Sequence, residues 1–196
     1  MTRPRSLAQR SSEARMLDAQ QRILAYIDQS EVPEDPAHAR NTLAWVLRLW
    51  PEADPALRLA ALAHDIDRAS KDKVCRDDYG DYDSFKAAHA RHGAQLLRAL
   101  LEDCKLDPAA IEEACRLVRL HETGGDLRAN LLRDADSLSY FEVNLPLYYQ
   151  REGEHETLRR CAWGVQRLSA DALRLLQQFE FADPEIHRLV QRVLDP

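Results

Sequence analysis

Four of the five Asp-Pro pairs in this chain constrain its fold more than any other feature of its sequence. They occupy positions 35–36, 54–55, 107–108 and 183–184. Aspartate is a favoured N-cap, and proline fits the first helical turn, where its missing N–H has no helical partner. Each pair therefore predicts the first turn of a helix, with the aspartate as its cap.

Helical spacing of apolar residues continues along most of the chain, whereas strand-type alternation is scarce. The 196 residues include only six glycines, and the abundant alanine, leucine, arginine and glutamate are good helix formers. The sequence therefore predicts an all-α protein with a single domain over 1–196. The predicted helices span 6–29, 36–50, 54–66, 83–104, 108–122, 129–144, 154–180 and 184–194.

Three features mark interruptions between these helices. Gly124-Gly125 should end the helix that carries His121. Pro146 should interrupt or kink the segment after Asn144. The charged stretch 69–83 has no clear period and is expected to form a long loop.

The charge balance limits the classes of partner. The net charge is −6, and lysine and arginine are spread along the chain. This distribution argues against a nucleic-acid polymer or a membrane surface as partner, although a local basic pocket stays compatible with it. No apolar run approaches the roughly 20 residues of a membrane span, and the N-terminus lacks the apolar core of a signal peptide. The four cysteines form no CxxC pair, so we expect free thiols in a cytoplasmic protein.

The stretch LRLAALAHDIDRAS, residues 57–70, reads as a buried helix that suddenly places His64 beside Asp65. Burying an ionised carboxylate beside an imidazole is costly unless something pairs with it. A single histidine on an apolar face is commonly a core residue with its hydrogen bonds satisfied. That interpretation weakens here, because several such residues occur on consecutive amphipathic helices.

Asp136 is a candidate ligand because its neighbours along one helical face, Leu132, Tyr140 and Val143, are apolar or aromatic. Asp134 has a more mixed face and is expected to support the site or to be solvated. Imidazole and carboxylate together suit divalent manganese, iron, cobalt, nickel or zinc. Two adjacent residues bind an ion weakly, so other helices must supply further ligands, and His38 and Asp136 are the natural contributors.

The order of these residues resembles that in the HD-domain superfamily of metal-dependent phosphohydrolases. LAALAHDIDR is similar to the His-Asp motif of that superfamily, and HARHGAQLL, VRLHE and RDADSLS resemble motifs that accompany it. The resemblance covers roughly 35–145. It implies an HD-type helical bundle with additional N- and C-terminal helices. The helices after about 150 show no motif of the family and are expected to serve packing or a dimer surface, so a homodimer is one expectation.

The resemblance also implies a set of site residues. The residues that match the ligands of the first metal are His38, His64, Asp65 and Asp136. His89 and His121 match residues that bind a second metal in some members and contact the substrate phosphate in others. Asp65, Arg68, His89 and His121 would take part in catalysis. The chain has Asp67-Arg68 where many relatives have Gly-Lys, and Arg68 could replace that lysine as a phosphate partner.

The implied activity is hydrolysis of a phosphate ester of a small molecule, for example a nucleotide, with one or two divalent ions (Mn, Fe, Co, Ni, Mg or Zn) that activate water. Two alternatives stay open at this point. Some HD proteins with the full set of six ligands carry two irons and activate oxygen. A non-catalytic module that senses a nucleotide is the other alternative.

Several further residues have two interpretations. His92 lies one turn from His89 and could replace it as ligand, although a place behind His89 is favoured. Tyr79 and Tyr82 could stack on a nucleobase or cover local apolar surface, and His155 and His187 are expected on the surface. The cations that could steady a phosphoryl group, each of which could equally be a surface residue, are Arg40, Arg68, Lys71, Lys73, Lys86 and Arg91.

Overall fold

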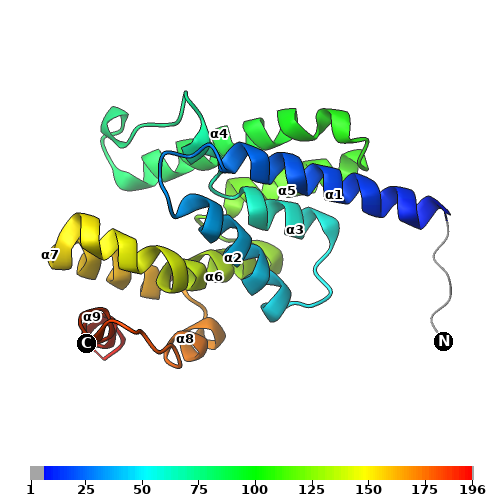
Figure 1. Cartoon of the computed structure of the whole chain (residues 1–196). Coiled ribbons are helices and arrows are strands. Elements are labelled where there is room, and N and C mark those ends of the chain that lie inside the picture. Colours follow the sequence, from blue (N-terminus) through cyan, green and yellow to red (C-terminus); the bar gives the residue numbers. More distant parts are fainter. Residues whose placement is uncertain (1–6, 196) are drawn as a thin grey trace, which may run out of the picture.

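The computed structural model describes the backbone of residues 7–195 and the side chains from residue 11 onward. Within these residues the protein is all-α, as predicted, and no strand occurs (Figure 1). The α-helices are α1 (Leu7–Ile27), α2 (Asp35–Leu49), α3 (Pro55–Ala63), α4 (Tyr82–Leu101), α5 (Pro108–Leu120), α6 (Leu127–Ser139), α7 (Leu145–Arg167), α8 (Ala170–Leu176) and α9 (Pro184–Leu194). Short 3₁₀ turns are η1 (Ile66–Ala69), η2 (Arg76–Asp78) and η3 (Glu102–Cys104), and η4 (Tyr140–Asn144) is a π-helical turn.

The helix α3 lies at the centre of the packing. Nearly all of its residues are buried, because a helix that is apolar on every side must be surrounded by others. It contacts α1, α2, α5 and α6, and its alanines allow close approach. Because α3 ends at Ala63, the chain delivers His64 to the interior of the molecule.

These four Asp-Pro pairs all stand at the start of a helix, as predicted. The carboxylates of Asp54, Asp107 and Asp183 each accept a backbone N–H in the first turn of α3, α5 and α9. The predicted cap was wrong for Asp35, which is itself the first residue of α2 and whose side chain caps no backbone N–H. Its carboxylate instead accepts a hydrogen bond from Ser30 Oγ (2.6 Å) and forms an ion pair with Arg68 (2.9 Å).

The predicted helix over 54–66 was too long. Regular helix ends at Ala63, and Asp65 adopts φ −104° and ψ 18° before η1 begins. This change of direction brings His64 and Asp65 to the same space, which a continuous helix would not do, since adjacent residues on a helix point about 100° apart. The first predicted helix, 6–29, corresponds to α1, although residue 6 lies outside the described residues.

The predicted single helix over 154–180 was also wrong. The chain forms α7, which contains Gly153 at φ 77°, and then breaks before α8. At the break, the N–H of Ser169 donates to Asp134 Oδ1 (2.9 Å), while Ser169 Oγ caps α8. Pro146 stands in the first turn of α7, directly after the π-helical turn η4, so the expected interruption at this proline is confirmed.

The remaining connections follow their local signals. Gly124 has φ 71°, and its N–H donates to Leu120 O (2.7 Å) at the end of α5. Most of 69–83 is irregular apart from short 3₁₀ turns. All four cysteines are free thiols. None of the described helices combines the length and apolar character that a bilayer-spanning segment needs.

Candidate metal centre

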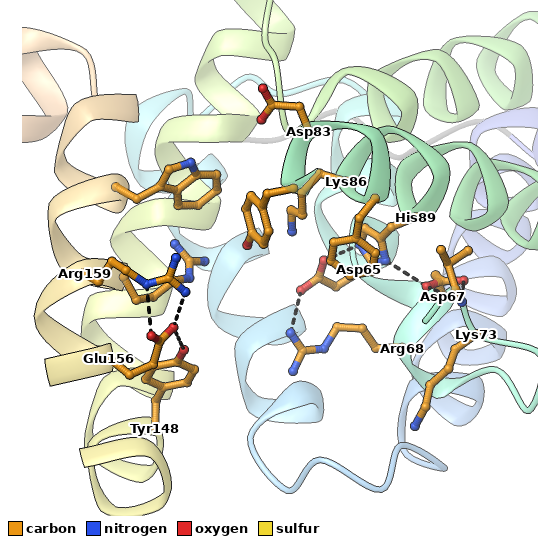
Figure 2. A pocket seen from close by; sticks show the side chains of 15 residues that line it. Asp65, Asp67, Arg68, Lys73, Asp83, Lys86, His89, Tyr148, Glu156 and Arg159 are labelled. Carbon is orange, nitrogen blue, oxygen red and sulfur yellow. Dashed lines mark hydrogen bonds and ion pairs between the residues drawn. The ribbon is translucent and has the colours of Figure 1, made fainter. Parts of the chain in front are cut away.

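A cavity of about 510 Å³ opens between α7 and the helices that carry the predicted site residues (Figure 2). Asp65, Lys86 and His89 line one side, and Tyr148 and Arg159 of α7 line the other. A smaller chamber of about 70 Å³ adjoins this cavity and shares Asp65, Lys86 and Arg160 with its wall. The walls of this chamber include His38, Asp65, Glu122 and Asp136.

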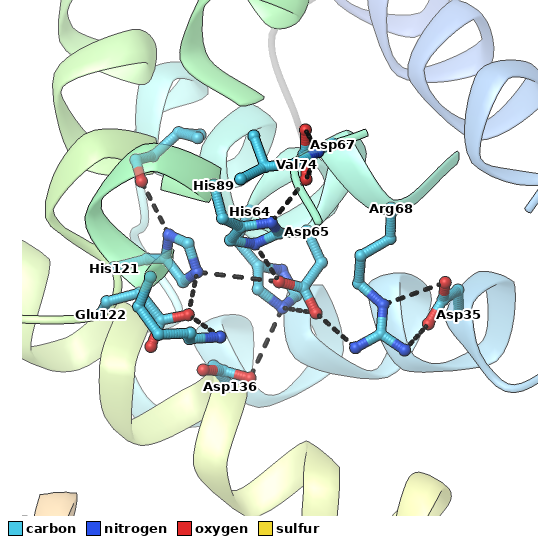
Figure 3. Close-up of polar contacts among 12 residues, drawn as sticks. Asp35, His64, Asp65, Asp67, Arg68, Val74, His89, His121, Glu122 and Asp136 are labelled. Carbon is cyan, nitrogen blue, oxygen red and sulfur yellow. Dashed lines mark hydrogen bonds and ion pairs between the residues drawn. The ribbon is translucent and has the colours of Figure 1, made fainter. Parts of the chain in front are cut away.

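The six predicted ligands converge on one region from distant parts of the chain, and Figure 3 shows five of them, His64, Asp65, His89, His121 and Asp136. Each imidazole is at most 3% exposed, and Asp136 is 7% exposed. Such burial of so many polar groups requires them to satisfy one another or a cation. The residues are His38 in the first turn of α2, His64 and Asp65 after α3, His89 in α4, His121 after α5 and Asp136 in the last turn of α6.

The first group of donor atoms consists of His38, His64, Asp65 and Asp136. The two Nε2 atoms of the histidines lie 3.1 Å apart. Asp136 Oδ1 lies 3.2 Å from Nε2 of His38 and 3.5 Å from Nε2 of His64. Asp65 Oδ2 lies 4.0 and 3.8 Å from the same two nitrogen atoms. All four side chains therefore direct a donor atom at one small volume.

The second group consists of Asp65, His89, His121 and Glu122. Asp65 Oδ1 lies 2.9 Å from His89 Nε2 and 3.7 Å from His121 Nε2. Glu122 Oε1 lies 3.0 Å from His121 Nε2. One donor atom from each residue lies within 4.8 Å of the others, a spacing that suits a shared metal ion. Asp65 thus belongs to both groups, one carboxylate oxygen toward each.

The chemistry of the donors fits a divalent transition metal. Both groups combine imidazole nitrogen with carboxylate oxygen, the set that manganese, iron, cobalt, nickel and zinc accept. His121 Nε2 is buried and has no hydrogen bond of acceptable geometry, although Glu122 is close by. Such a nitrogen is more costly to leave unpaired than to offer to a cation. The residues therefore fit one or two divalent ions.

The opposite ring nitrogen of each histidine has its own partner, which orients the ring. Nδ1 of His64 and of His121 donates to a backbone carbonyl three residues earlier, at 3.0 and 2.7 Å. A carbonyl can only accept, so Nδ1 carries a proton and Nε2 is the nitrogen through which each ring can bind a metal. Nδ1 of His38 meets Ser139 Oγ at 2.8 Å, and that of His89 meets Asp67 Oδ2 at 2.8 Å. Metal-binding histidines need this kind of support.

Charges in the centre shift the protonation of its members. Burial disfavours the charged form of His64, but Asp65 and Asp136 outweigh it and raise the pKa of His64 to about 9. Burial likewise opposes ionisation of Asp136, yet hydrogen bonds from His38 and His64 hold its pKa well below the usual value. The carboxylates are therefore ionised, and a cation bound here competes with the protons of the imidazoles.

Glu122 was not predicted from the sequence. Its carboxylate forms ion pairs with Lys86 and, at 3.2 Å, with Arg167 Nη2. A local signal for it exists: His121-Glu122 follows the apolar end of α5 as His64-Asp65 follows α3. In both places the backbone leaves the helix directly after a histidine, which brings the next carboxylate inward.

Their contacts with Asp67 show which of the two histidines of α4 faces the centre. His89 Nε2 faces Asp65, whereas Nδ1 of His92 contacts Asp67, the carboxylate that also holds Nδ1 of His89. His89 is therefore placed as the donor and His92 behind it. Arg68 forms an ion pair with Asp35 and lies 3.7 Å from Asp65 Oδ2.

Only some of the cations predicted for a phosphoryl group reach the cavity. Arg68, Lys73 and Lys86 line it, and Tyr82 lies in its wall. Arg40 forms an ion pair with Asp28 on the surface. The residues that lie on the surface or cover local apolar surface, away from these two chambers, are Lys71, Tyr79, Arg91, His155 and His187.

The helix α7 contributes more than packing. Tyr148, Arg160 and Trp163 line the cavity, and Arg167 Nη2 lies 3.3 Å from Asp136 Oδ2 and 3.1 Å from the carbonyl of His121. The region after about 150, expected to serve packing or a dimer surface, thus also lines the cavity and contacts the donors through α7. No sequence motif marks these side chains of α7, because only tertiary packing brings them to the cavity.

A family model described as a domain of unknown function, DUF4202, matches residues 8–190. Comparisons with curated proteins and with solved structures gave no match.

Proposed function

This chain belongs to the DUF4202 family, a domain of unknown function, and we propose that it is a metal-dependent phosphohydrolase that cleaves a phosphate ester of a small molecule. The observation that carries the proposal is the position of Asp65 between two groups of buried donors at the base of a cavity. The resemblance of the motifs to the HD-domain superfamily agrees with it, and an HD-type bundle is part of the proposal.

The donor residues form two sets of metal ligands. His38, His64 and Asp136 would hold one ion, and His89, His121 and Glu122 a second, with Asp65 shared between them. Bound divalent ions supply activation of water near neutral pH and neutralisation of charge on the phosphoryl oxygens. The supports on Nδ1 keep the four imidazoles in place, so little reorganisation is needed when substrate arrives.

The two chambers suggest where the phosphoryl group and the rest of a substrate molecule would bind. The smaller chamber is lined by the donors His38, Asp65, Glu122 and Asp136 and by the cations Arg68, Lys86 and Arg160. A phosphoryl group at its mouth would therefore meet both the bound metal and a cationic side chain. The larger cavity would take the rest of the molecule. Its aromatic side chains, Tyr82, Phe85 and Trp163, would exclude water from the ester.

Turnover with defined metals tests the proposal. Protein depleted of metal with a chelator and reloaded with Mn²⁺, Co²⁺ or Ni²⁺ should release phosphate from p-nitrophenyl phosphate or from a panel of nucleotides and sugar phosphates. Asp65→Ala and His64→Ala should reduce the rate to background, because each removes a donor. His155→Ala, on the exposed surface, is the control and should keep the wild-type rate. Folded, metal-loaded protein that cleaves nothing in the panel would refute the proposal.

A di-iron enzyme that activates oxygen is the second candidate. The observation in its favour is that both groups offer histidine nitrogen and share one carboxylate, a set that iron accepts. Iron at two atoms per chain in protein as purified, with a mixed-valence signal in electron paramagnetic resonance, would support it. Full activity with redox-inert Zn²⁺ or Mg²⁺ would exclude it.

A further inference from the structure

The guanidinium of Arg160 in α7 packs against two aromatic rings. The carbon at the centre of its guanidinium lies 4.4 Å from the ring centroid of Tyr140 and 4.3 Å from that of Trp163. Tyr140 is 5% exposed, and Trp163 is itself held by Arg167 at 4.2 Å and by the edge of Tyr82 at 5.7 Å. Aromatic contacts on a guanidinium leave its N–H edge free and restrict its rotation.

Arg160 has no carboxylate partner within 4.0 Å in the part of the chain that the structure describes. The other cations around the two chambers are engaged in ion pairs. These pairs are Arg68 with Asp35, Lys73 with Glu31, Lys86 with Glu122, Arg151 with Glu34 and Arg159 with Glu156. A half-buried guanidinium that carries its charge without a counter-ion is available to an anionic ligand.

The position of Arg160 indicates which ligand group it would meet. It lines both the cavity of about 510 Å³ and the chamber of about 70 Å³ whose wall includes four of the metal donors. A group bound by Arg160 therefore lies at the junction of the two, next to the donors and facing the space for the rest of the ligand. In an ester of the proposed kind, the group at that junction is the phosphoryl group.

We propose that Arg160 binds the phosphoryl group of the substrate through its N–H edge, with Tyr140 and Trp163 holding it in position. This inference rests on the proposed function and deepens it, since it assigns the anion-binding residue to α7, outside the motifs. Two N–H groups of a guanidinium match two oxygens of a phosphoryl group. Because the rings already restrict the side chain, little rotamer entropy remains to be lost on binding.

Binding of inorganic phosphate, which needs no turnover, tests this role. Wild-type protein loaded with Ni²⁺ should bind phosphate in isothermal titration calorimetry. Arg160→Met should raise the phosphate Kd at least about tenfold, as expected for loss of a charged hydrogen-bond pair. Arg160→Lys should fall between the two, because it keeps the charge but loses the planar pair of donors.

A matched control is available in Arg48, whose guanidinium also lies over a tryptophan, 4.6 Å from the ring centroid of Trp45, but away from both chambers. Arg48→Met should leave the phosphate Kd unchanged. Metal content and circular dichroism of each variant confirm that the centre and the fold persist, and Arg160→Lys keeps the test valid if Arg160→Met does not fold.

The outcomes separate this inference from the proposed function. If Arg160→Met or Arg160→Lys binds phosphate as wild type does, or if wild type does not bind phosphate, the role of Arg160 is overturned. If phosphate binding depends on Arg160 while no ester is cleaved, the anion site stands and the hydrolase proposal falls. If esters are cleaved, Arg160→Met should raise KM for them by a factor similar to that seen for phosphate.

Discussion

At the scale of single residues, the centre depends on the groups that hold its ligands as much as on the ligands. Asp67 is 1% exposed, and its carboxylate contacts Nδ1 of both His89 and His92 and accepts the N–H of Val74. Burial opposes its ionisation, but the hydrogen bonds from the two histidines lower its pKa. An ionised Asp67 keeps the Nδ1 proton of His89 in place and points Nε2 at Asp65.

Replacement of Asp67 tests this support. Asp67→Ala should weaken metal binding at the second group by about 10- to 100-fold, the usual effect of losing such a partner, while the first group keeps its ion. Metal titration followed by elemental analysis measures both. His92→Ala should have a smaller effect, because Asp67 still holds His89. Equal metal affinity in Asp67→Ala and wild type would show that His89 needs no such partner.

At the scale of helices, two of them end in the same way to build the site. Both α3 and α5 are followed by a histidine whose Nδ1 donates to the carbonyl three residues earlier, and then by a carboxylate. After α5 the chain turns at Gly124 and is steadied by Asn130, whose Oδ1 accepts the N–H of Gly125 at 3.0 Å. The end of α5 thus determines where the second group lies.

Gly124 is the residue of this turn at which a side chain would be most strained. Its φ is 71°, and an added Cβ would overlap Asn130 Oδ1. Gly124→Ala should therefore lower the free energy of unfolding by about 1–3 kcal/mol, as measured by urea denaturation. Gly80→Ala is the control, since Gly80 is exposed and nothing lies within 4 Å of an added Cβ. Equal losses in the two variants would contradict the proposed strain.

At the scale of the whole molecule, the two donor groups join segments from α2 to α6. Ions bound there would connect these helices directly, and the unfolded chain lacks such a preformed site. Metal binding should therefore stabilise the entire fold and not only the centre.

Thermal unfolding measures this linkage. Free Ni²⁺ or Mn²⁺ at about 100 times its Kd should add about 2.7 kcal/mol of stability, which for a chain of this size raises Tm by about 5–10 °C. A chelator should reverse the rise. Asp65→Ala should abolish most of it, because both groups lose a donor, whereas His155→Ala should retain it. A Tm that does not respond to metal would argue against a bound ion in either group.

The sequence by itself determined the all-α class, most helix positions and the residues that converge on the centre, apart from Glu122. These features depend on signals within one or two turns: apolar spacing, Asp-Pro starts and a histidine-carboxylate pair inside an apolar segment. Tertiary structure decided the rest. Four features depend on contacts between residues about 20 to 35 positions apart in the chain. They are the pairing of Asp35 with Arg68, the break held by Asp134 and Ser169, the contact of Arg160 with Tyr140 and the contact of Arg167 with Asp136. Coulomb interactions and hydrogen bonds act over a few ångströms of space, and packing alone determines which distant residues come that close.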